Sequence, residues 1–161
     1  MFLGLTILLV LSQPMAPAPC ASPEHRQFDF WIGDWEVRTP DGALAGTNSI
    51  RPELNGCVLH ERWEGARGMK GESFNTWSRA RRQWHQTWVD DRGTLLLLDG
   101  GRDGARMVLT GEGRSPDGAP VRHRISWEAL GEAVRQLWES STDEGRTWTV
   151  VFDGKYTRRA Q

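Results

Sequence analysis

The chain has 161 residues, a length at which a single domain is expected, and its formal charge is −1 because 20 Lys and Arg residues nearly balance 21 Asp and Glu residues. Basic residues gather only at Arg79, Arg81 and Arg82, whereas a nucleic-acid-binding protein usually carries a basic stripe. We therefore expect no nucleic-acid partner.

The chain begins with an apolar run over residues 1–11, which is too short for a stable helix across a bilayer. Ser12-Gln13-Pro14 interrupts the run, and small residues and prolines follow as far as Ala21, which is typical of a secretory signal peptide. We expect residues 1–21 to be a cleaved signal, with the mature N-terminus between Pro19 and Pro23. The protein would then be exported (periplasmic or secreted), with no membrane association after cleavage. A membrane anchor or a misplaced start codon is the alternative, since the apolar run lacks a preceding Lys or Arg.

The chain has two cysteines, Cys20 and Cys57. If Cys20 leaves with the signal, Cys57 is a free thiol and the fold contains no internal disulfide, so the core alone must hold it together. The other use of Cys20 would be lipidation, but Pro19 stands where a lipoprotein signal favours Gly or Ala.

Short strands separated by glycine-containing turn signals make up residues 22–161, which we expect to form one domain. Only residues 22–30 have a helical pattern, and they predict a short helix before the first strand. The predicted strands, in chain order, are 33–39, 46–51, 56–64, 71–77, 83–90, 94–98, 106–112, 122–128, 133–140, 147–152 and 155–159. The glycine-rich stretch 99–104 and the Asp153-Gly154 pair are expected to separate strands.

No stretch between these strands is long enough for a helical crossover, so neighbouring strands should be antiparallel. About ten sequential strands predict an all-β protein, an antiparallel up-and-down barrel of the calycin or lipocalin-like type. Closure of the sheet on itself would leave no exposed edge strand.

Aromatic and polar residues alternate with period two along three of the predicted strands, so they share one face of each strand. The pairs concerned are Glu61 with Trp63, Gln86 with Trp88, and Gln136 with Trp138. Such a face is too aromatic for solvent and too polar for a dry core, so it predicts the wall of a partly polar cavity inside the barrel. The alternative is a tryptophan-rich core, because the chain has nine tryptophans.

Two turn motifs have structural interpretations. Gly33-Asp34-Trp35 resembles the Gly-x-Trp signature of calycin barrels, in which an Arg from a late strand packs on the Trp, and Arg158 could supply that Arg. Residues 141–148 match the Asp-box pattern Ser-x-Asp-x-Gly-x-Thr-Trp, which predicts a hairpin stabiliser with Gly145 at positive φ and Asp143 accepting backbone hydrogen bonds. Sugar binding is the alternative for this second motif.

No histidine pair has the spacing of a metal site, so we expect neither a metal nor a cofactor. His60 and His85 fall on the strand faces opposite the aromatic wall, and we expect both to be exposed. Glu61 on the inner face could form a buried ion pair with Arg124, or it could be a carboxylate poised by burial as a proton acceptor.

Several segments together resemble a bacterial family of uncharacterised, calycin-like small domains, domain of unknown function 1579. The matching segments are Phe28–Trp35, Gly56-Cys57 with Glu61-x-Trp63, Gly71-x-Ser73-x-Asn75, Trp84–Asp90 and Phe152–Tyr156. The resemblance implies a β-barrel of an exported protein and no particular activity. A more distant similarity is to the haem-binding nitrobindin barrels, although a match to their haem-ligand region is lacking.

These observations favour an exported barrel that binds a small apolar or aromatic molecule and is a monomer or a weak homo-oligomer. The expected ligand-binding residues are Glu61, Trp63, Asn75, Gln86, Trp88, Arg124, Gln136 and Trp138. The first alternative is an enzyme, an isomerase, cyclase or hydrolase that uses Glu61 as its acid or base. The second is haem binding through His60 or His123.

Overall fold

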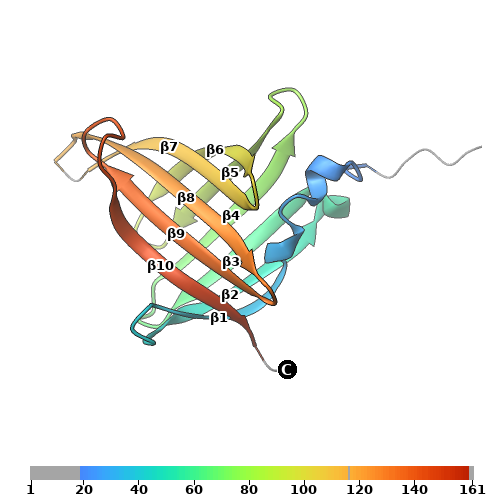
Figure 1. Cartoon of the computed structure of the whole chain (residues 1–161), viewed down its shortest axis with the longest axis horizontal. Coiled ribbons are helices and arrows are strands. Elements are labelled where there is room, and N and C mark those ends of the chain that lie inside the picture. The colour runs from blue at the N-terminus through green and yellow to red at the C-terminus, as the bar shows by residue number, and fades with distance from the viewer. Residues whose placement is uncertain (1–18, 116, 160–161) are drawn as a thin grey trace, which may run out of the picture.

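Ten antiparallel strands close into a barrel in the computed structural model, which describes residues 19–115 and 117–159 (Figure 1). The expected signal therefore lies almost wholly outside the described residues. The strands are β1 (Gly33–Arg38), β2 (Leu44–Glu53), β3 (Val58–Gly65), β4 (Lys70–Ser78), β5 (Gln83–Asp90), β6 (Leu95–Asp103), β7 (Arg106–Arg114), β8 (Pro120–Leu130), β9 (Ala133–Ser141) and β10 (Thr149–Arg158).

Each strand pairs with its neighbours in sequence, and β1 pairs with β10 to close the sheet. The predicted all-β, up-and-down architecture is thus confirmed. Tight hairpins make this connectivity possible, because glycines such as Gly42 and Gly118 take positive φ, a conformation in which other residues are strained.

The predicted break at Asp153-Gly154 is wrong, and the predicted break at 99–104 is wrong except at Gly104, which lies in the turn between β6 and β7. Strand β6 continues through Gly100, where a Cβ would lie 2.1 Å from the carbonyl oxygen of Val108. Strand β10 continues through Gly154, where a Cβ would lie 2.6 Å from the ring of Phe152, so the two last predicted strands are one. These glycines allow close packing within the sheet rather than turns between strands.

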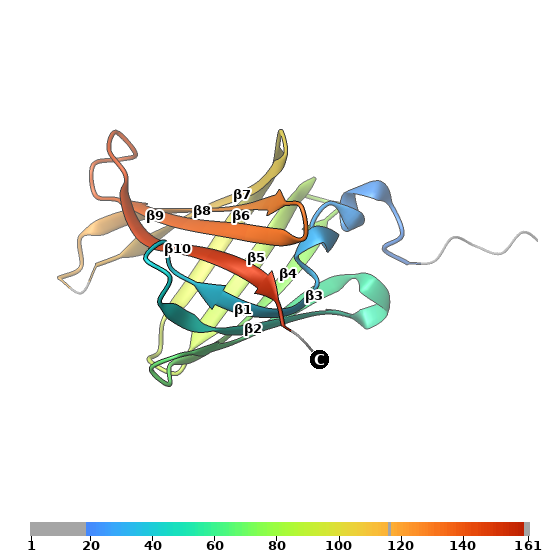
Figure 2. The ribbon, with the colours of Figure 1, turned by 60° about the horizontal axis from the view of Figure 1, so that its bottom comes forward.

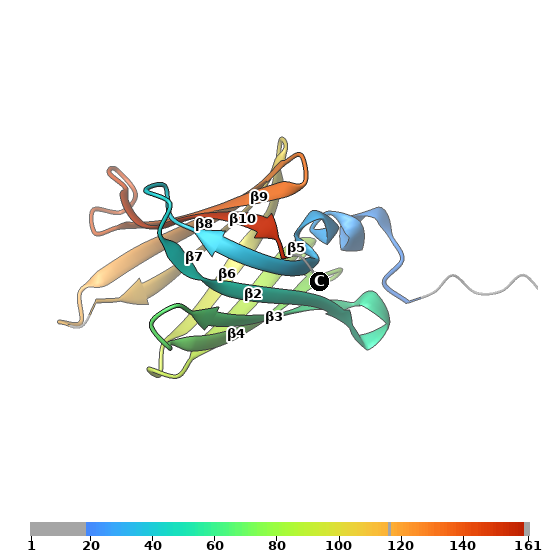
Figure 3. The same ribbon diagram turned by 90° about the horizontal axis from the view of Figure 1, so that it is seen from below.

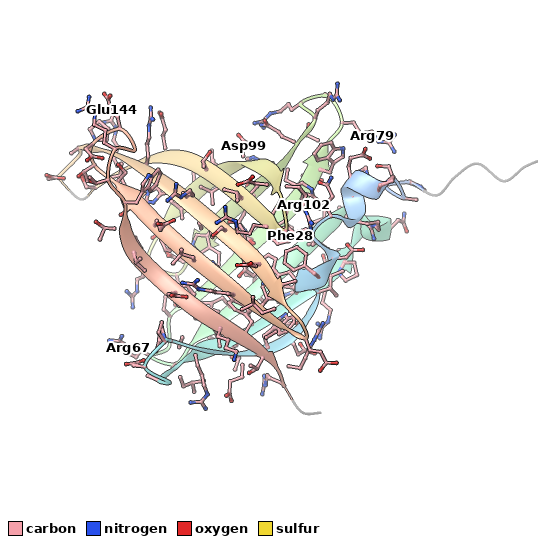
Figure 4. The ribbon with its side chains drawn as sticks, viewed as in Figure 1. Phe28, Arg67, Arg79, Asp99, Arg102 and Glu144 are labelled. Atoms are coloured by element: carbon pink, nitrogen blue, oxygen red, sulfur yellow. A yellow bond between two sulfur atoms is a disulfide. The ribbon has the colours of Figure 1, made fainter. Side chains whose placement is uncertain are left out.

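One end of the barrel is closed by the N-terminal segment, which lies at the same end in all views (Figures 1, 2 and 3). The predicted short helix consists of two 3-10 turns, η1 (Pro23–Arg26) and η2 (Asp29–Trp31). Phe28 and Trp31 are fully buried, and Phe28 packs against Trp84 and Trp127 with ring centroids 5.7 and 5.1 Å away. We call residues 23–31 the plug; Figure 4 labels Phe28 at this end and Glu144 at the other.

The predicted contact between Arg158 and Trp35 is confirmed at the plugged end. The Arg158 guanidinium lies 3.9 Å from the centroid of the Trp35 ring and donates to the carbonyl oxygen of Ile32 at 2.7 Å. Gly33 makes room for it, because a Cβ there would lie 1.7 Å from Nη1 of Arg158.

The prediction that Cys57 is a free thiol is wrong, because Cys57 forms a disulfide with Cys20. Cys57 directly follows the short turn η3 (Leu54–Gly56), and Cys20 lies just before the plug. Arg26 of the plug also donates to the carbonyl oxygen of Gly56. The expectation that the fold has no internal disulfide is therefore also wrong: the plug is covalently tied to the barrel.

Candidate functional site

The six alternating residues, Glu61, Trp63, Gln86, Trp88, Gln136 and Trp138, all point into the barrel, as the period-two pattern predicts. Glu61, Trp63 and Gln86 are buried, while Trp88 and Trp138 are partly buried and pack against the core. The strand pattern therefore identified the inward faces of β3, β5 and β9.

Glu61 is the centre of a chain of hydrogen bonds inside the barrel, and it is only 4 % exposed. Its two carboxylate oxygens accept hydrogen bonds from Nδ2 of Asn48 at 2.7 Å and from Oγ of Ser73 at 2.6 Å. Strand β2 supplies Asn48 and strand β4 supplies Ser73, so the strands on both sides of β3 turn a donor towards its carboxylate.

The chain of hydrogen bonds continues from Ser73 along β4 to β5. Asn75 donates to Oγ of Ser73 at 2.8 Å and to the carbonyl oxygen of Leu59 at 3.1 Å. Gln86 in turn donates to Oδ1 of Asn75 at 2.7 Å. Asn75 and Gln86 lie directly opposite each other in the strand register, which explains their contact.

The series of hydrogen bonds also continues from Asn48 across the barrel to β9 and β10. Nδ2 of Asn48 lies 3.5 Å from the hydroxyl of Tyr156, and this hydroxyl donates to Oε1 of Gln136. We call the seven connected residues the polar belt: Asn48, Glu61, Ser73, Asn75, Gln86, Gln136 and Tyr156. It links six strands around the interior, and all of its members except Glu61 are formally neutral.

Burial raises the pKa of Glu61, and the hydrogen bonds from Ser73 and Asn48 offset only part of that effect. The pKa of Tyr156 is also raised, first by burial and then by the nearby Glu61 charge. Neither carboxylate oxygen of Glu61 has a cationic partner among the described residues. Burial without a cationic partner therefore favours the protonated form of Glu61 over the ionised form.

The expected ion pair between Glu61 and Arg124 does not exist, because Arg124 lies on the outer face of β8. Its guanidinium bonds to Glu139 at 2.9 Å and lies 4.1 Å from the ring centroid of Trp148. The neighbouring Ile125 occupies the inward face instead. The prediction that Arg124 is one of the ligand-binding residues of the interior is therefore wrong.

Aromatic rings in the half of the barrel away from the plug cover glycines in its wall. A Cβ on Gly46 would lie 2.8 Å from the Trp63 ring, and one on Gly71 would lie 2.2 Å from the Trp88 ring. The ring of Phe152 covers Gly154 in the same way. Each of these glycines leaves room for a ring to lie directly against the sheet.

Solvent reaches this unplugged half from the open end of the barrel. Inward residues near the plug, such as Trp35 and Trp127, are fully buried. By contrast, inward side chains farther from the plug remain partly exposed, namely Trp88, His123, Gln136, Trp138 and Phe152. An inward side chain can be exposed only through an opening of the barrel. We call the half of the interior between the polar belt and the open end the lumen.

The expectation that His60 is exposed is wrong, although the residue does lie on the outer face. It is 5 % exposed because its ring stacks on Phe74, with centroids 4.4 Å apart, and contacts the carboxylates of Glu53 and Glu72. His85 is partly buried and contacts Asp99 at 2.8 Å. Since His60 points away from the lumen, His123 is the only one of the two expected haem ligands that faces inward.

The predicted Asp-box turn between β9 and β10 is confirmed. Gly145 has a φ of +92°, and Asp143 accepts a hydrogen bond from the backbone N–H of Thr147 at 2.8 Å. Hydrogen bonds from the Thr147 side chain and backbone lower the pKa of the Asp143 carboxyl to about 2. A hollow of about 620 Å³ lies between this turn and the β7–β8 hairpin, and none of its lining residues belongs to the polar belt.

Sequence reasoning missed Asn48, Ser73 and Tyr156 as members of the polar belt. Ser73 could have been predicted from the sequence, because it shares a strand face with Asn75. In the structure it lies opposite Glu61 in the register of β3 and β4. Asn48 and Tyr156 carried a weaker signal, since nothing in the sequence shows that their side chains meet across β1.

The described residues contain no cluster of His, Cys, Asp and Glu that could hold a metal ion, and none of their helices is long and apolar enough to cross a membrane. Comparison with protein-family models found no match for the chain, and a search of curated proteins found none either.

Proposed function

We propose that this protein is an exported barrel that binds a small apolar or aromatic molecule in its lumen. The observation that carries the proposal is the partial exposure of inward aromatic side chains above a buried polar belt. Aromatic surface left open to solvent inside a barrel costs free energy, and a bound apolar molecule would cover it.

The arrangement of groups supports binding through both shape and polarity. Trp88, Trp138 and Phe152 offer apolar surface, and the polar belt offers a small number of fixed hydrogen-bonding groups, a combination common in ligand pockets. Glycine in the wall fixes the rings before a ligand arrives, which lowers the entropy lost on binding.

The disulfide supports the exported location, because disulfides persist mainly in oxidising compartments. In this proposal the ligand is the principal partner, and the protein itself is a monomer or a weak homo-oligomer.

Binding of the neutral fluorescent probe N-phenyl-1-naphthylamine tests the proposal. We expect saturable binding with enhanced probe fluorescence, and we expect Trp138→Ala to weaken it at least about tenfold, since a large apolar contact is lost. Trp148→Ala is the matched control, because Trp148 packs on Arg124 outside the lumen, and it should bind as the parent does. Absence of saturable binding, or equal effects of the two variants, would refute the proposal.

A second candidate function is catalysis by Glu61, as an isomerase, cyclase or hydrolase. The observation in its favour is the raised pKa of a buried carboxylate that has no cationic partner. Turnover of a bound compound that is abolished by Glu61→Gln while the compound still binds would establish this function over simple binding.

A further inference from the structure

The lumen has a distinct charge character. Among the described residues, Glu61 is the one acidic side chain of the polar belt, and no Lys or Arg side chain contacts the belt. Arg158 is inward but is held at the plugged end by Ile32 and Trp35. His123 faces inward, and burial lowers its pKa. When Glu61 is ionised, the charge of the polar belt is therefore negative.

The polar belt also contains an acceptor without a donor. Oδ1 of Asn48 is fully buried and has no hydrogen-bond partner, while Nδ2 of the same amide donates to Glu61. Asn48 is 3 % exposed, so the missing donor cannot be bulk water. A buried polar atom without a partner costs free energy, and a ligand that donates to it would remove that cost.

The aromatic rings around the lumen favour the same kind of ligand. Trp63, Trp88 and Phe152 each lie against a glycine of the wall, and the rings of Trp63 and Phe152 also contact each other edge-on, with centroids 6.0 Å apart. The faces of aromatic rings carry negative electrostatic potential and attract cations as well as flat apolar groups.

We infer that the ligand is a protonated amine carried on an aromatic or apolar body. This inference rests on the proposed binding function and adds the chemical class of the ligand. The ammonium group supplies three N–H donors, which complement the Glu61 carboxylate and the unpaired Oδ1 of Asn48. The body of the ligand contacts Trp63, Trp88 and Trp138. A carboxylic acid or phosphate would instead be repelled by Glu61.

Three compounds that share one ring system test this inference: 1-naphthylmethylamine, 1-naphthalenemethanol and 1-naphthoate. Their binding is measured by calorimetry and by displacement of N-phenyl-1-naphthylamine. We expect the amine to bind at least about tenfold more tightly than the alcohol, because its hydrogen bonds to the belt are charge-assisted, and we expect naphthoate to bind most weakly.

Glu61→Gln should reduce the advantage of the amine over the alcohol to about threefold or less, because the charge is removed and the shape is kept. Glu139→Gln is the matched control, since that carboxylate pairs with Arg124 on the outer face, and it should leave the advantage intact. If Glu61→Gln does not fold, Asn48→Leu removes the unpaired acceptor and should also lower the amine's advantage.

The outcomes separate the inference from the proposed function. If the amine and the alcohol bind equally well, the inferred ligand class is wrong, while binding in the lumen stands. The same holds if the advantage of the amine over the alcohol persists in both Glu61→Gln and Asn48→Leu. If none of the three compounds and no N-phenyl-1-naphthylamine binds, the proposed function fails and the inference fails with it.

Discussion

Glu61 is a carboxyl group surrounded by neutral donors, and this determines how it affects stability. Burial raises its folded-state pKa, so the folded protein binds a proton at Glu61 more tightly than the unfolded chain does. The protonated form therefore stabilises the fold at low pH. That contribution is lost as the pH rises from the ordinary carboxyl range through the raised pKa, because the folded state must then bury a charge.

Glu61→Gln should consequently raise the melting temperature at pH 8 more than at pH 4, because glutamine is neutral at both. Asn48 can accommodate the change, since rotation of its amide turns the unpaired Oδ1 towards the new NH₂ group. Thermal unfolding monitored by circular dichroism at the two pH values measures the difference. A melting temperature that falls more at pH 8 than at pH 4 would instead show that the Glu61 charge stabilises the empty barrel.

The hairpin between β9 and β10 shows how a local motif determines the geometry of an element. Ser141, Asp143 and Thr147 bond to one another across the turn, and the chain reverses at Gly145. Trp148 then packs against Arg124 on the outer face of the barrel. The motif therefore has a sufficient structural role in joining two long strands.

Gly145→Val should lower the free energy of unfolding by about 1–3 kcal/mol, the cost of a strained backbone conformation. The positive φ disfavours any side chain there, and a Cβ would also lie 3.4 Å from the Trp148 ring. Thr142→Val is the control, because it introduces the same side chain at an exposed position of the same turn. Urea unfolding compares the two variants, and equal midpoints would contradict the structural role of the motif.

Strand periodicity predicted the barrel and its inward faces, but it could not predict which inward residues meet. Parity alone places Glu61 inside, whereas its contact with Ser73 depends on the register between β3 and β4. The Arg124 pairing failed for a related reason: Ile125 and Trp127 already occupy the inward face of β8, so Arg124 has the opposite parity. Gly100 and Gly154 were mistaken for turn residues because a glycine's packing neighbours are not visible in the sequence.

The two ends of the barrel differ, and the disulfide is part of that difference. The plug closes one end with Phe28 and Trp31, while the other end gives solvent access to the lumen. Cys20 and Cys57, which are 37 residues apart, connect the segment before the plug to the residue that directly precedes β3. A signal that ended at Ala21 would remove Cys20 from the mature chain, so we now propose that cleavage occurs before Cys20.

The exported protein should therefore retain Cys20, and its intact mass should be two hydrogens below that of the reduced chain. Opening the disulfide should lower the free energy of unfolding by about 3–4 kcal/mol, because a loop of this length is no longer constrained in the unfolded state. The Cys20→Ser/Cys57→Ser double variant should melt like the reduced parent and should not respond to dithiothreitol. An exported chain that begins after Cys20, or that carries a lipid on it, would contradict this prediction. In either case the aromatic contacts of Phe28 and Trp31 would hold the plug without a covalent tie.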